Sequence, residues 1–177
     1  MKIFDRRRVV PIVVSLLFAA SAIQARAQDA ATSFSAWVAD FYRDEVARHA
    51  HQALQLSDEE RLNLFTPELG ALIVESRNHV PPPSEPVGPI LDLFLGWGAL
   101  PNREITLNGV TAASAVDGKS RATVDITIAG YRRPLVLTGV FDRQAKRWRI
   151  ADIDYGDGSL DTTLVGRMRR IATWRLR

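Results

Sequence analysis

Three aspartates lie where a strand carboxylate can act as a general base. Asp125, Asp152 and Asp154 all fall in runs that are typical of β-strands. A carboxylate does such work when an apolar surround raises its pKa toward neutrality. Tyr42 or Tyr155 would polarise a carbonyl beside such a base. The competing interpretation is that these acids are solvated on the outer side of a sheet, as strand acids commonly are. The sequence therefore assigns no catalytic residue.

The histidines raise the question of a metal site. His49 and His51 are two residues apart, so on a helix they point about 200° from each other and cannot share an ion. No acid completes a zinc-binding H-E-x-x-H set around them or around His79. We expect solvated histidines at helix ends, and neither a metal nor a cofactor.

Trp97 is the aromatic residue with the most conformational freedom around it. It lies between Gly96 and Gly98, which allow backbone shapes that no packed helix requires. We expect Trp97 to line the mouth of a cleft, with Tyr42 as the nearest aromatic of the first helix. The candidate ligand-binding residues are Trp97, Tyr42, Asp125 and Asp154.

A cluster of arginines ends the chain. The last eleven residues contain Arg167, Arg169, Arg170, Arg175 and Arg177 and no acid. Such a cluster suits an anionic surface, but cations at a helix C-terminus are also favoured by the helix dipole alone. The sequence predicts at most a weak contact with an anionic surface and no specific nucleic-acid site; the protein or small-molecule partner stays unknown.

The first 27 residues have the pattern of a cleavable export signal. Lys2 and three consecutive arginines precede an apolar run from 9 to 23, and Ala25-Arg26-Ala27 is a small-x-small cleavage site. The run is short for a membrane span. We expect residues 28–177 to form one soluble α+β domain in the periplasm or outside the cell. Both the twin-arginine and the general secretory routes remain open.

Removal of the signal changes the charge balance. Residues 1–27 hold five of the 23 Lys and Arg and one of the 20 Asp and Glu, which leaves 18 basic and 19 acidic groups. The high pI of the whole chain therefore gives no argument for nucleic-acid binding. The chain has no cysteine, which excludes disulfides, a thiol nucleophile and a lipid-anchored cysteine.

Residues 102–155 predict a meander of four antiparallel strands. Between 120 and 130, apolar and polar residues alternate with a period of two, which indicates one dry and one wet face. Asp117-Gly118 favours a tight hairpin before this strand. We expect a turn at 131–134, and we expect Trp148 and Ile150 to be buried beneath the first helix.

Helical patterns surround this sheet. Residues 34–46 repeat apolar side chains at helical spacing, Ser57 to Glu60 forms a capping box, and Thr66-Pro67 restarts a helix. We expect these helices to cover the dry face of the sheet. Five prolines between 79 and 89 predict a stiff extended strap, and Ser159 is expected to cap a last helix.

Four segments, taken in their order along the chain, resemble those of a known protein family. The aromatic first helix ending in Phe41-Tyr42, the segment 64–69, the segment 91–95 and the last strand, 148–155, resemble the bacterial family called domain of unknown function 3828. That family in turn resembles the cystatin-like, or nuclear-transport-factor-two-like, superfold. The resemblance implies helices packed in the concavity of a curved antiparallel sheet. It implies no activity, because the superfold hosts enzymes and binding modules alike.

The sequence thus predicts an exported, non-enzymatic binding or interaction module. The alternative is a small-molecule lyase or isomerase with a strand carboxylate in a pocket between sheet and helices. A base of that kind would have to face the interior, whereas a filled interior favours the module.

Overall fold

The computed structural model describes residues 33–50, 56–80, 92–96, 103–156 and 162–176, without the side chains of 80, 114–116, 175 and 176. The first helix spans 33–50. It is followed by α2 (Asp58–Asn63), α3 (Pro67–Ser76), β1 (His79–Val80), β2 (Ile105–Val116), β3 (Lys119–Ile128), β4 (Tyr131–Asp142), β5 (Arg147–Asp154), α4 (Leu164–Ile171) and β6 (Arg175–Leu176).

The four long strands form the predicted antiparallel meander, in the order β2-β3-β4-β5. The hairpin at Asp117-Gly118 is confirmed, since both residues have positive φ, 52° and 72°. These values match the type of two-residue turn that suits the twist of paired strands. The α+β class expected from the sequence is therefore confirmed.

The second hairpin corrects an expectation. The turn is formed by Ala129 and Gly130, with φ of 49° and 83°, and Tyr131 already belongs to β4. Pro134 lies inside the strand and pairs with Asp125, while β5 begins to pair with β4 only at Val136. A proline fits there because β4 has no β5 neighbour at that position.

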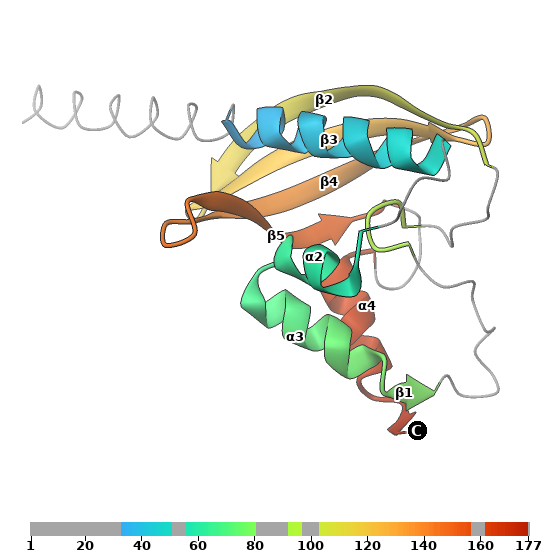
Figure 1. Ribbon diagram of the computed structural model, residues 1–177, viewed down its shortest axis with the longest axis vertical. Helices are drawn as coiled ribbons and strands as arrows, with labels where there is room; N and C mark the ends of the chain where they lie inside the picture. The colour runs from blue at the N-terminus through green and yellow to red at the C-terminus, as the bar shows by residue number, and fades with distance from the viewer. Residues whose placement is uncertain (1–32, 51–55, 81–91, 97–102, 157–161, 177) are drawn as a thin grey trace, which may run out of the picture.

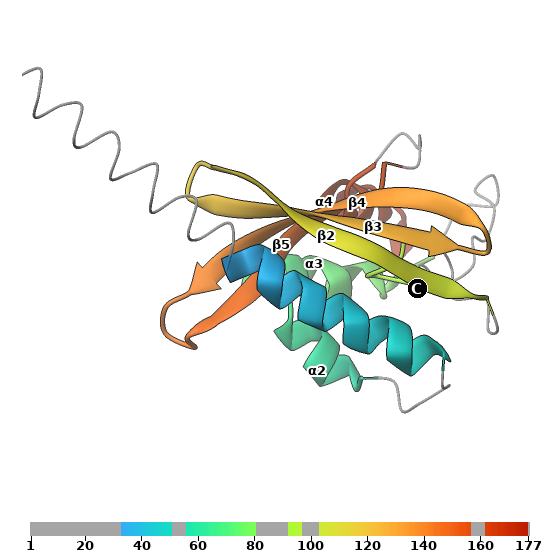
Figure 2. The ribbon, with the colours of Figure 1, turned by 90° about the horizontal axis from the view of Figure 1, so that it is seen from above.

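The first helix lies across one face of the sheet, oblique to the strands (Figures 1 and 2). Phe34, Val38 and Tyr42 form its fully buried stripe. Phe34 packs directly over Gly139 of β4, where any side chain would overlap its ring. Of the two residues expected beneath this helix, Ile150 is fully buried and Trp148 is partly buried, with its ring centroid 5.0 Å from that of Phe34.

The other helices gather beside β5 rather than over the sheet (Figure 1). The capping box at Ser57 and the cap at Thr66 with Pro67 at the first helical position are both confirmed. The last helix differs from the expectation that Ser159 caps it, because its N-cap is Thr163. Ser159 lies outside the described residues. Within the described part of the chain, no helix has the length and apolar character needed to cross a membrane.

His79 also differs from expectation. It is buried, and its Nδ1 lies 3.0 Å from the carbonyl oxygen of Glu75. The strand that contains it, β1, pairs with β6 at the end of the described chain, with His79 opposite Leu176. This pairing brings the arginine-rich end of the chain against the end of α3.

Candidate functional site

Asp125 lies on the outer face of the sheet, as the alternation predicts. Its carboxylate forms an ion pair with Arg132 and accepts a hydrogen bond from Asn108 Nδ2 at 3.2 Å. The hydrogen bond from Arg132 lowers the pKa of Asp125. A carboxylate held in its charged form in this way is a poor general base at neutral pH. Asp125 lines a shallow hollow of about 580 Å³ over β2, β3 and β4.

Asp154 and Tyr42 line neither this hollow nor the groove described below. Asp154 is half-buried, and its Oδ1 accepts the backbone N–H of Gly156 at 3.0 Å. Tyr42 is fully buried in the core, and burial raises its pKa. Trp97 lies outside the described residues. The three described candidates, Asp125, Asp154 and Tyr42, therefore do not share either hollow.

Aromatic rings pack between the first helix and the sheet. Tyr42 donates its hydroxyl to the carbonyl of Phe94 at 2.7 Å, and Tyr155 donates to the carbonyl of Leu93 at 2.8 Å. The ring of Phe94 stacks on Phe65 with centroids 5.5 Å apart. Two buried tyrosines thus anchor the turn at 92–96 within the core.

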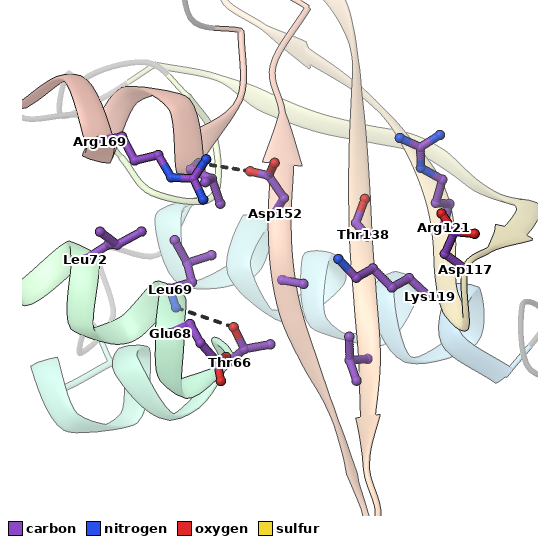
Figure 3. Close-up of a pocket in the computed structure, with 13 residues that line it drawn as sticks. Thr66, Glu68, Leu69, Leu72, Asp117, Lys119, Arg121, Thr138, Asp152 and Arg169 are labelled. Carbon is purple, nitrogen blue, oxygen red and sulfur yellow. Dashed lines mark hydrogen bonds between the residues drawn. The ribbon is translucent and has the colours of Figure 1, made fainter.

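A second hollow lies on the outer face of the sheet, the face opposite the first helix. It is an open groove of about 640 Å³. Its floor is a row of residues paired across the strands, Arg121 with Thr138 and Thr138 with Asp152. One wall comes from Leu69 and Leu72 of α3 (Figure 3). The groove exists because α3 and α4 extend past β5.

Two threonine caps hold α3 and α4 at the edge of β5 that does not pair with β4. The backbone N–H of Thr66 donates to the carbonyl of Ile150 at 2.9 Å, and Thr66 then caps α3. Thr163 forms a bridge with Asp154 and caps α4. Because each cap residue also bonds to β5, the strand fixes where both helices begin.

Asp152 connects the floor of the groove to α4. Its Oδ1 accepts the backbone N–H groups of Ile153 at 2.9 Å and Val165 at 3.0 Å. Burial is the main cause that raises the pKa of Asp152, and the hydrogen bonds from Val165, Ile153 and Thr163 oppose it. An acceptor for the first turn of a helix is a structural role for this carboxylate.

Three cationic side chains surround this floor. Lys119 and Arg121 come from β3, and Arg169 comes from α4 on the other side (Figure 3). All three are exposed, and none of them forms an ion pair with a described residue. Glu68 and Asp117 supply acids at the rim. The groove therefore combines available cations with an apolar wall.

The terminal arginines have separate environments. Arg167 lies over the ring of Tyr155, 4.6 Å from its centroid, whereas Arg169 lines the groove. Arg170 is partly buried, and the backbone of Arg175 lies in β6. Among the described residues no group of three or more His, Asp or Glu is placed to hold a metal ion.

A scan of protein-family models and searches of curated proteins and of solved structures found no match to this chain. The functional argument therefore rests on the geometry of the molecule.

Sequence reasoning named Arg169 and Asp152 but missed Lys119, Arg121 and the wall from α3. The signal for Lys119 and Arg121 was present in the alternation of β3, which places Arg121 on the wet face. Its cross-strand neighbour proved to be Thr138 and not an acid. That pairing is set by the strand register, which the residues of β3 alone do not reveal.

Proposed function

We propose that this chain is an exported, soluble, non-enzymatic binding module of the cystatin-like type, related to the domain of unknown function 3828 family, and that its ligand site is the outer-face groove. Its ligand is a small amphipathic anion, with a carboxylate or phosphate group and an apolar body. The leader pattern of residues 1–27 supports the exported, periplasmic or secreted location.

The observation that carries the proposal is the set of three cations without a described acidic partner. Lys119, Arg121 and Arg169 approach the groove from two elements on opposite sides. Charged side chains of this length ordinarily remain solvated at little cost, so their exposure alone says little. Their placement around an apolar wall is what suits a ligand with one anionic end and one apolar end.

The apolar part of the ligand would lie against α3 and α4. Leu72 and Val165 are only partly buried and line the groove together with Val140 from the sheet. These side chains offer contact area that the fold itself does not cover. The anionic end would then meet arginine, whose planar guanidinium binds carboxylates and phosphates with two parallel hydrogen bonds.

One observation favours the second candidate, a lyase or isomerase with a strand carboxylate as base. Asp152 lines the groove, and its pKa is raised. The binding role is preferred because the same carboxylate already accepts two backbone N–H groups. The enzymatic reading requires Asp152→Asn to abolish exchange of a ligand C–H proton with deuterated water, measured by NMR.

The binding proposal is tested with ligands that share one apolar body. Isothermal titration calorimetry with octanoate, octyl phosphate and octylamine separates the contribution of charge from that of the chain. We expect both anions to bind and octylamine to bind at least about tenfold more weakly. Arg121→Gln and Arg169→Gln should each weaken octanoate binding by about tenfold, because a hydrogen bond to a charged group contributes about 1.5–3 kcal/mol.

The matched control is Arg143→Gln. Arg143 is exposed in the turn between β4 and β5 and lines neither hollow. The control should bind octanoate as the wild type does. Equal affinity for octylamine and octanoate, or an equal loss in all three arginine variants, would rule out the groove as an anion site.

A further inference from the structure

The two edges of the four-stranded sheet differ in whether other described segments of the chain are hydrogen-bonded to them. At the β5 edge, the backbone N–H of Ile150 donates to the carbonyl of Leu64 at 2.8 Å, and that of Tyr155 donates to Thr162 at 2.9 Å. The chain thus covers this edge with its own segments. At the other edge, β2 pairs with β3 only, among the described residues.

The sequence of β2 lacks two of the usual protections of an open edge, charged side chains and proline. Its twelve residues, ITLNGVTAASAV, include no charged residue and no proline. Edge strands normally carry lysine, proline or a bulge, or are very short, because unpaired N–H and C=O groups recruit another strand. Bulges interrupt β2 at 107–109 and 113–116 and leave a regular run from Gly109 to Ala113 between them.

The apolar face of the sheet is also incompletely covered at the β2 edge. Ile105, Leu107 and Val110 point toward the core but are only partly buried, and Ala112 is exposed. In β3 the residues paired with them, such as Ile126 and Val124, are fully buried. A further strand beside β2 would extend the apolar layer as well as the hydrogen-bonded ladder.

We propose that β2 pairs antiparallel with β2 of a second copy of this chain, so that two four-stranded sheets join into one. Pairing about a two-fold axis near Val110 places the start of one strand beside the end of the other. Arg103 and Glu104 precede β2 and Asp117 follows it, so this arrangement places the arginine of each copy near the aspartate of the other. The uncharged strand between them meets its own copy without like-charge repulsion.

The interface is small, so the dimer is reversible. A single strand pair between two domains buries less area than the standard stable interface of about 1,200–2,000 Å². We expect a monomer–dimer equilibrium with a dissociation constant in the micromolar range, on the order of that of weak complexes.

The test is sedimentation velocity on the protein expressed from the full chain, across a concentration series. Thr111→Lys places one charge on each copy close to the two-fold axis and should raise the dissociation constant at least about tenfold. The matched control is Thr123→Lys, the residue paired with Thr111 on the inner strand and the same face. The control should dimerise as the wild type does.

Hydrogen exchange on the wild type makes the result independent of how the variants fold. Backbone N–H groups in the run 109–113 that face the free edge should be protected at high protein concentration and exposed at low concentration. A sample that stays monomeric at every concentration, or concentration-independent exchange in β2, overturns the proposal. Equal loss of dimer in Thr111→Lys and Thr123→Lys would also overturn it, because it would indicate packing through the sheet face.

Discussion

Tyr42 joins the first helix to the turn at 92–96 through a single buried hydrogen bond. Because the hydroxyl donates to the carbonyl of Phe94, Tyr42→Phe leaves that carbonyl without its partner in the core. Such a loss costs about 1–3 kcal/mol in the free energy of unfolding, measured by urea denaturation. Tyr131→Phe is the control, since Tyr131 is 69% exposed and should change stability by less than about 0.5 kcal/mol. Equal effects would contradict the role given to Tyr42.

Asp152 gives a pH dependence whose sign follows from its raised pKa. Folding favours its protonated form, so its contribution to stability is fully present below the unfolded pKa of about 3.9 and is lost as pH rises through the folded pKa. Asp152→Asn keeps an acceptor oxygen but does not titrate. The free energy of unfolding of the wild type minus that of Asp152→Asn should therefore decrease from pH 4 to pH 7, as measured by urea unfolding at both pH values. A difference that rises with pH would show that the pKa is lowered.

The pH dependence has to be measured as a difference between wild type and variant, because other carboxylates change the stability with pH in the opposite direction. The pKa values of Asp125 and Asp142 are lowered, the first by a hydrogen bond from Arg132 and the second by the backbone N–H of Ala145. They contribute stability above their unfolded pKa, and this is lost as pH falls through the folded value. Wild type and Asp152→Asn share both groups, so their contribution cancels.

At the scale of elements, the closest contact between helix and sheet is that of Phe34 with Gly139. A methyl group at Gly139 would overlap the Phe34 ring, so Gly139→Ala should lower the free energy of unfolding by about 1–3 kcal/mol, as overpacking does. Thermal and urea denaturation measure this loss. Gly109→Ala is the control, because no atom lies within 4 Å of a methyl group there.

A smaller side chain at the facing position provides a second check. In the variant Phe34→Leu with Gly139→Ala, the total loss should be less than the sum of the two single losses, because the leucine leaves room for the methyl group. Additive losses would indicate that Gly139 is needed for another reason.

The sequence predicts those elements whose signals are local. The hairpin at Asp117-Gly118, the capping box at Ser57 and the cap at Thr66 depend on a few neighbouring residues, and all three are confirmed. The turn expected at 131–134 is wrong, because Tyr131 and Pro134 belong to β4. Whether a proline interrupts a strand depends on which side has a neighbour, and that is fixed by the end of β5.

The candidate site was less predictable because it is assembled from distant segments. Leu69, Arg121 and Arg169 come from three different elements, and only the docking of α3 and α4 against β5 brings them to one groove. The start of α4 depends in the same way on Thr163, whose bridge partner Asp154 belongs to β5. Periodicity reports which face of an element is dry, but not which other element stands beside it.

At the scale of the whole molecule, the two faces of the sheet have different environments. The inner face, with Val124 and Leu137 among its fully buried residues, is closed by the first helix. The outer face carries the hollow at Asp125 and the groove at Asp152. Substitutions on the outer face can therefore test the proposed binding while the core is preserved, and the arginine variants use this separation.

The strands of the meander contact their neighbours in the chain, whereas the first helix contacts strands that are distant in the chain. We expect this difference to set the order in which the two form during folding. Each strand pairs with its neighbour in sequence, so the sheet can form through short loop closures. We expect Phe34 to meet Gly139 only after the strands have paired, because these two contacting residues lie far apart in the chain. Contacts absent from the transition state affect mainly the rate of unfolding. Stopped-flow measurements should thus find Phe34→Leu unfolding faster while refolding at nearly the wild-type rate; a slower refolding arm would place helix docking before the barrier.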